Sequence, residues 1–149
     1  MRMNLKKILK KSNICIDLKS TDKKSVISEM LDIIISNGIV KDPEGALKAL
    51  YEREEKMSTG MEMGIAIPHA RTDAVSELQI AVGISRKGVD FEALDGEPSR
   101  IIIMTLSPTA RSGPHIQFIA AISNILSDFN KREGLIKAAT VEEALKILI

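Results

Sequence analysis

Two histidines stand at positions where proteins commonly present reactive side chains. His69 and His115 are the only histidines among the 149 residues, and each follows a proline at the junction of two predicted elements. A neutral imidazole is a competent nucleophile at physiological pH when one ring nitrogen is held as a hydrogen-bond donor and the other keeps its lone pair. The chemistry that suits such residues is the acceptance of a phosphoryl group.

The segment before His69 predicts how its ring is presented. Residues 65–67 form an apolar, β-like run that Pro68 follows. Because proline has no N–H to donate to a sheet, we expect Pro68 to end the strand and His69 to lie just past the sheet edge.

Phosphoryl transfer also needs donors around the charged oxygens of the transferring group. The sequence offers side-chain donors and a glycine-containing loop with backbone N–H groups: Arg53, Arg71, Thr59, His115, Gly60 and Gly64. With His69 as the acceptor, these residues make up the predicted site. No metal-ligand set is predicted, because two histidines and scattered carboxylates lack the spacing of a metal site.

Each candidate also has an ordinary structural explanation. A lone histidine is more often a satisfied polar side chain than a reactive one. Arg53 lies in the acidic run 52–55, where a solvated helix face is the simpler interpretation. The Ser58-Thr59 pair is typical of a turn that ends a helix. Spacing alone leaves both interpretations open.

The composition argues against several functions. The net charge is only +1 and aromatic residues make up 3%, so neither a basic surface nor stacking rings favour nucleic-acid binding. Cys15 is the only cysteine, which excludes an internal disulfide framework and favours a reducing compartment, the cytoplasm. Charges interrupt segment 1–11 before any apolar core, and the longest apolar run, 33–35, is far too short to span a bilayer. We therefore expect neither a secretory signal nor direct membrane insertion.

The elements that must position the candidate residues predict one domain over residues 1–149. A short β-like run at 14–16 precedes two helices, one capped near Asp22 and one opened by Asp42-Pro43. Three strands are expected at 65–67, 78–84 and 101–106, and helices follow from Gly113 and from a predicted capping box at 140–143. The run 101–106 is almost continuously apolar, as in a strand covered on both faces. The predicted fold is a single-domain three-layer α/β/α sandwich with a central mixed sheet.

Three short motifs together resemble a known active-site signature. They are Arg53-Glu54, Ser58-Thr59-Gly60 and Ile65-Ala66-Ile67-Pro68-His69. They resemble the type-2 IIA components of the bacterial phosphoenolpyruvate-dependent sugar phosphotransferase system, the fructose/mannitol and nitrogen-regulatory IIA family. The resemblance extends over essentially the whole chain, including residues 91–96 and the expected helix at His115.

The resemblance implies specific roles. His69 would accept phosphate from the phosphohistidine of the small carrier protein HPr or a paralogue, His115 would lie beside it, and Arg53 would orient or neutralise the phosphoryl group. Neither ATP nor a metal is implied as a cofactor. The family fold, a mixed sheet between helical layers, agrees with the independent prediction.

One position departs from the family pattern, which prefers Gly or Ala where this chain has Glu62. A carboxylate pointing inward there would repel an incoming phosphoryl group, although Arg71 would offset it. The nearby methionines Met57, Met61 and Met63 suit a docking surface for protein partners, with core packing as the alternative.

Two functions from different classes follow. In the first, the chain passes phosphate from His69 to a IIB component that loads a fructose-like or mannitol-like sugar. In the second, the phosphorylation state of His69 controls binding to regulatory target proteins and no sugar is delivered. A metal-dependent hydrolase is disfavoured for want of ligands.

Overall fold

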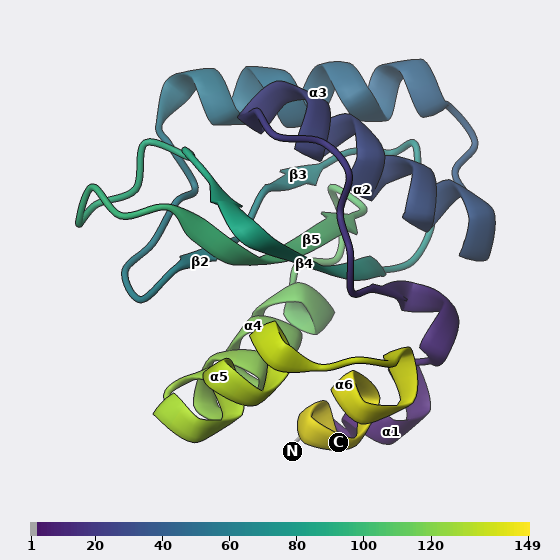
Figure 1. Cartoon of the computed structure of the whole chain (residues 1–149). Helices are drawn as coiled ribbons and strands as arrows, with labels where there is room; N and C mark the ends of the chain where they lie inside the picture. The colour runs from purple at the N-terminus through teal and green to yellow at the C-terminus, as the bar shows by residue number, and fades with distance from the viewer. Residues whose placement is uncertain (1–2) are drawn as a thin grey trace.

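The computed structural model describes residues 3–149 and confirms the predicted three-layer arrangement around a mixed sheet (Figure 1). Met1 and Arg2, the start of the segment in which no secretory signal is predicted, lie outside the described residues. The elements in chain order are α1 (Leu5–Ile8), a 3-10 turn η1 (Lys11–Asn13), β1 (Ile14–Cys15), α2 (Lys23–Asn37), α3 (Pro43–Lys56), β2 (Ile65–Ala66), β3 (His69–Arg71), β4 (Gln79–Val89), β5 (Ser99–Ser107), α4 (Gly113–Leu126), α5 (Phe129–Lys137) and α6 (Val141–Leu148).

Strand β5 is the centre of the sheet. It pairs antiparallel with β4, while β2 and β3 both run parallel to it on its other side and β1 runs parallel to β4. The continuous apolar run of β5 is explained by burial on both faces, because Ile101, Ile102, Ile103 and Met104 are all fully buried. The prediction of a central strand from this run is confirmed.

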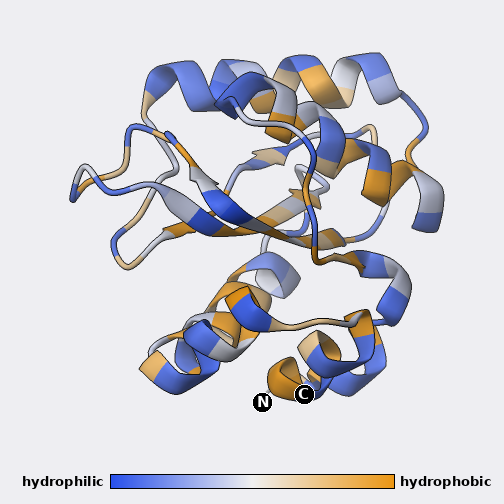
Figure 2. Cartoon of the chain, in the orientation of Figure 1, coloured by the Kyte–Doolittle hydropathy of each residue, from blue (hydrophilic) through white to orange (hydrophobic). Residues whose placement is uncertain are grey.

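Alternate residues of β5 serve two separate cores. Ile102 and Met104 pack with α2 and α3, whereas Ile101 and Ile103 pack with Phe118 of α4 and with α5 and α6. Figure 2 shows that the helices turn their apolar sides toward the sheet and their polar sides outward. Because side chains alternate along a strand, Thr105 follows the odd-numbered set and lies on the α4 face.

Helix caps form where the short polar residues predict them. Asp22 accepts a hydrogen bond from Ser25 N at 2.9 Å at the start of α2, and Asp42 accepts one from Gly45 N at 3.0 Å at the start of α3. The predicted capping box before α6 forms only in part. Thr140 caps Glu143 N, but the Glu143 carboxylate accepts from Ala139 N instead of Thr140 N.

The predicted end of the sheet at Pro68 is wrong. After Pro68 the chain continues along β5 as β3, in which His69 pairs with Thr105. Proline lacks a donor but keeps its acceptor, and Thr105 N donates to Pro68 O at 3.2 Å. The proline therefore divides two short strands, and His69 lies within the sheet.

Candidate functional site

His69 and His115 stack against each other although they lie 46 positions apart in the sequence. Their ring centroids are 5.5 Å apart and the ring planes differ by 30°. His69 lies on β3 and is in register with Thr105 of β5, and paired residues on neighbouring strands share a face of the sheet. The chain leaves β5 at Ser107 and returns in α4, whose first turn carries His115 over the same face. Both rings are partly exposed.

The His69 ring is fixed by the backbone. Its Nδ1 lies 2.8 Å from the carbonyl oxygen of Ile67. A carbonyl can only accept, so Nδ1 carries the proton and donates, and the neutral ring keeps its lone pair on Nε2. The arrangement leaves Nε2 as the nucleophilic atom.

The His115 ring is held from the sheet by a side chain. Its Nδ1 lies 2.9 Å from Oγ1 of Thr105. Burial lowers the pKa of His115 below its ordinary value, and its proximity to His69 and to the Arg71 guanidinium lowers it further. His115 therefore favours the neutral form in the absence of an anion.

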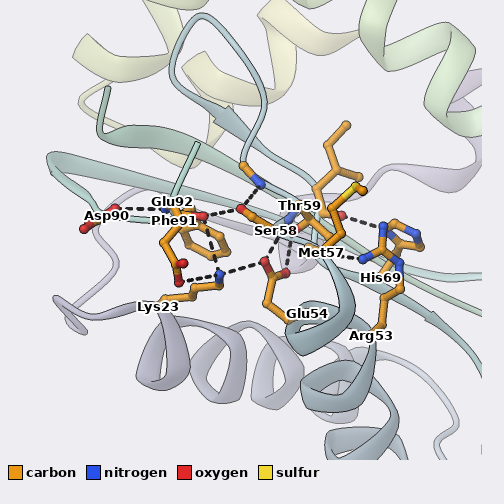
Figure 3. Close-up of polar contacts among 12 residues, drawn as sticks. Lys23, Arg53, Glu54, Met57, Ser58, Thr59, His69, Asp90, Phe91 and Glu92 are labelled. Carbon is orange, nitrogen blue, oxygen red and sulfur yellow. Dashed lines mark hydrogen bonds and ion pairs between the residues drawn. The ribbon is translucent and has the colours of Figure 1, made fainter. Parts of the chain in front are cut away.

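Arg53 lies in the last turn of α3, on the other side of the sheet from α4. Its Nη1 donates to Met57 O at 2.7 Å. Figure 3 shows the Arg53 guanidinium on the same side of the view as the His69 ring. This hydrogen bond uses one of the several N–H donors of the planar group. Helix α3 packs against β3, which explains how the end of one layer reaches the histidine strand.

Glu54, adjacent to Arg53, is the residue whose role sequence reasoning missed. It is buried, it accepts hydrogen bonds from Thr59 N at 2.7 Å and Thr59 Oγ1 at 2.5 Å, and it pairs with Lys23 Nζ at 2.9 Å (Figure 3). Lys23 also pairs with Glu92 at 3.2 Å. The signal was present in the sequence: Ala46, Leu50 and Glu54 follow at intervals of four and all lie on the buried side of α3.

The network centred on Glu54 changes the expected role of Thr59. Its hydroxyl donates to the Glu54 carboxylate, so this proton is not available for the predicted contact with a phosphoryl oxygen. Gly60 is a close-packing residue, since a Cβ there would lie 2.9 Å from Ala93 Cα. Both residues shape the chain between α3 and β2.

Gly64 is not brought to the histidine pair. Its carbonyl accepts from Ile101 N at 3.0 Å, at the far end of β5 from Thr105, so about four residues of strand, roughly 13 Å, separate it from His69. Its φ of 72° explains the glycine by turn geometry. The loop's own contacts also use the N–H groups of Gly60, Met61 and Met63. Three N–H groups of the loop are therefore occupied by contacts within the protein.

The same loop presents Glu62 and the methionines to solvent. Met57, Met61 and Met63 are exposed by 69%, 43% and 56%, which rules out core packing for these side chains. Glu62 is exposed as well and lines, with Met61 and Met63, an open groove of about 320 Å³ beside α4.

Arg71 lies two residues after His69 on β3, with Ala70 buried between them. Side chains two apart on a strand share a face, and Arg71 contributes to the lowered pKa of His115. Its Nη2 donates to Thr109 O at 2.6 Å, which ties β3 to the loop before α4. Of the predicted phosphate-binding residues, Arg71 therefore lies with the pair, whereas Gly64 does not.

Within residues 3–149, no cluster of three or more His, Cys, Asp or Glu side chains is placed to hold a metal ion. No helix in this part of the chain is long and apolar enough to cross a membrane. The chain is therefore an α/β protein of the three-layer class, with a mixed sheet between two helical layers and a stacked histidine pair on one face of the sheet.

Comparison with known proteins is more specific. Residues 7–149 match the family model described as phosphoenolpyruvate-dependent sugar phosphotransferase system, EIIA 2. The chain therefore belongs to this EIIA family, which confirms the resemblance seen in the sequence. It is 39% identical over 126 residues to a fructose-specific EIIA component of Haloferax volcanii, covering 85% of this chain and 82% of that protein. It is also 32% identical over 146 residues to a fructose-specific EIIABC component of Bacillus subtilis, covering 98% of this chain but 23% of that longer protein.

Solved structures agree with the sequence match. The nitrogen regulatory protein IIA-Ntr of Neisseria meningitidis superposes with a TM-score of 0.85 at 30% identity, covering 96% of this chain and 97% of that one. The mannitol IIA of Escherichia coli, solved in complex with phosphorylated mannitol IIB, gives a TM-score of 0.82 at 26% identity over 94% of this chain and 96% of that one. The family thus includes both transport and regulatory members.

Proposed function

We propose that this protein is a phosphohistidine carrier in which His69 Nε2 accepts a phosphoryl group from an HPr-like phosphoprotein. The observation that carries the proposal is the hydrogen bond from His69 Nδ1 to Ile67 O, which leaves the Nε2 lone pair free beside His115. The family membership supports the same chemistry. We place this reaction in the cytoplasm, where a free Cys15 stays reduced.

The proposed reaction is an in-line displacement at phosphorus. The Nε2 lone pair forms the new N–P bond while the N–P bond of the donor breaks, and its electron pair returns to the donor imidazole. The His69 Nδ1 proton stays on the hydrogen bond to Ile67 O, so the phosphorylated ring carries positive charge and its N–P bond is activated for the next transfer. His115, Arg53 and Arg71 are the proposed partners of the phosphoryl oxygens.

The proposed acceptor is a IIB component that loads a fructose-like or mannitol-like sugar. The similar mannitol IIA that is known in complex with its phosphorylated IIB supports an acceptor of this kind. The exposed Met57 and Met63, with Ile116 of α4 exposed by 63%, offer adaptable apolar contacts for donor and acceptor proteins. A partner with a complementary apolar surface would bury them.

Incubation with phosphoenolpyruvate, enzyme I and HPr, or with the nitrogen-branch paralogues, tests the proposal. Mapping of acid-labile phosphate by mass spectrometry should place one phosphoryl group on His69 and none on the His69→Ala variant. The His115→Ala variant is the matched control, because it removes the other imidazole and should still be labelled. Phosphate that persists in His69→Ala, or labelling by neither donor set, would overturn the proposal.

A regulatory role is the second candidate, favoured by the similarity to IIA-Ntr over nearly the whole of both chains. In that role His69 phosphorylation would control binding to target proteins. Transfer of labelled phosphate to purified fructose- and mannitol-type IIB components separates the two candidates. Rapid transfer supports transport, and retention of the label with every cognate IIB supports regulation.

A further inference from the structure

Thr105 is in register with His69 on the neighbouring strand and contacts the ring of His115. It lies on the central strand β5 and is 1% exposed. Its backbone N donates to Pro68 O at 3.2 Å, in register with His69, while its Oγ1 lies 2.9 Å from His115 Nδ1. One buried residue therefore connects the strand that carries His69 to the ring of His115.

The two rings are anchored by the same atom but to different chemical groups. Each uses Nδ1, His69 toward the Ile67 carbonyl and His115 toward the Thr105 hydroxyl. A carbonyl accepts only, whereas a hydroxyl also donates. The two anchors therefore permit opposite tautomers in the two imidazoles.

The direction of the bond between Thr105 and His115 follows from burial. Within residues 3–149, His115 Nδ1 is the one hydrogen-bond partner of the Thr105 hydroxyl. A buried hydroxyl that only accepted would leave its own proton without a partner, which is unfavourable. The hydroxyl therefore donates to Nδ1, and the neutral His115 ring carries its proton on Nε2.

We infer that Thr105 is a positioning residue that sets His115 in the Nε2–H tautomer, complementary to the Nδ1–H tautomer of His69. This inference rests on the proposed phosphoryl transfer. His69 then offers a lone pair at Nε2 for attack, and His115 offers an N–H at Nε2 to the phosphoryl oxygens. With the opposite tautomer, the lone pair of His115 Nε2 would face an anion.

Nitrogen-15 NMR of the unphosphorylated protein at pH 8 tests the tautomer without any phosphate donor. We expect the Nε2–H pattern for His115 in the wild type and in Thr105→Ser, which keeps the hydroxyl. In Thr105→Val, which keeps the shape, the His115 shifts should move toward averaged values while those of His69 stay unchanged. An Nδ1–H pattern for His115 in the wild type, or unchanged His115 shifts in Thr105→Val, would overturn the inference.

Transfer kinetics provide the second readout. Thr105→Val should slow phosphoryl transfer by about tenfold, as loss of an outer hydrogen bond to a functional histidine does elsewhere, and Thr105→Ser should restore most of the rate. In the His115→Ala background, Thr105→Val should cause no further loss. Equal losses in the two backgrounds would show that Thr105 acts on the fold and not through His115. Because the NMR test needs no transfer, failure of the carrier function and failure of the tautomer inference are distinguishable.

Discussion

The imidazole of His69 donates a 2.8 Å hydrogen bond to the carbonyl of Ile67, two residues earlier, across Pro68. The bond needs no side-chain partner, so the tautomer of His69 is set by local backbone geometry alone. Pro68 contributes by its fixed φ, which narrows the conformations of the segment between the two groups. The motif Ile67-Pro68-His69 therefore contains both the ring and the means of orienting it.

Arg53→Lys should reduce phosphoryl transfer by at least tenfold, because lysine keeps the charge but loses the planar fork that contacts two oxygens at once. Lys56→Ala, in the same last turn of α3 and exposed, is the matched control. The measurement is the rate of His69 labelling with a purified donor. Full activity in Arg53→Lys would limit Arg53 to a general electrostatic effect.

His115→Ala should slow onward transfer more than it lowers the final extent of His69 phosphorylation. In the proposed reaction His115 supplies a donor to the phosphoryl group, whereas the variant keeps the proposed nucleophile, His69. Rapid-quench measurements of labelling and of transfer to an acceptor separate these two effects. Unchanged rates of both steps would show that His115 has only a structural role at the start of α4.

The free energy of unfolding should decrease as the pH falls below about 6.5, the ordinary value for histidine. Burial lowers the folded-state pKa of His115, so below the unfolded value the unfolded chain binds more protons. The stability is therefore fully present above that pH and is lost as the pH falls toward the folded pKa. Urea denaturation at several pH values should show that the free energy of unfolding depends less on pH, between pH 7 and 5, in His115→Gln than in the wild type. An identical dependence in both proteins would contradict the lowered pKa.

Lys23→Met should destabilise the fold by about 2 to 3 kcal/mol, because it leaves the buried Glu54 carboxylate without its cation. The loss stays below that of a fully buried pair, since the Lys23 side chain is 18% exposed. Lys48→Met, which removes an exposed ion pair to Glu52, is the control and should change stability by less than about 0.5 kcal/mol. Chemical denaturation measures both, and similar values for the two variants would refute the distinction.

Gly60→Ala should destabilise the protein by about 1 to 3 kcal/mol through overpacking. The added Cβ would lie 2.9 Å from Ala93 Cα and 3.0 Å from the Phe91 carbonyl oxygen, and backbone atoms cannot move aside as a flexible side chain can. At Gly113 a Cβ would meet nothing within 4 Å, so Gly113→Ala serves as the control. If Gly60→Ala left the midpoint temperature of thermal unfolding almost unchanged, this packing would be contradicted.

The sequence supported the layers of the fold and the position of His115 at the start of a helix, because apolar periodicity and the Gly113-Pro114 junction are local signals. The β3 strand was missed because pairing with β5 is a long-range property that outweighs the local effect of Pro68. Gly64 was assigned to the site for the backbone N–H groups of its loop, but the extended chain between Gly64 and His69 places Gly64 near the other end of β5.

Side-chain contacts between distant segments of the chain could not be predicted either. Nothing in the local sequence joins Lys23 to Glu54 or Thr105 to His115, since these contacts form only when the helices pack on the sheet. The burial of Glu54 could have been predicted, because Glu54 lies on the same face of α3 as the other buried residues. The role of Thr105 could not be inferred, because a threonine in an apolar strand is equally typical of ordinary β structure.

Strand β5 positions both histidines, because it pairs with the backbone of His69 and holds the His115 ring through Thr105. In the proposed reaction, the acceptor nitrogen of His69 therefore reaches its working position when the chain folds, and the conformational entropy of orienting it is lost before any partner arrives. Both rings are partly exposed, so a donor protein can approach them from solvent. The rate of phosphate exchange should follow the frequency of productive encounters, and it should rise with partner concentration until the complex saturates.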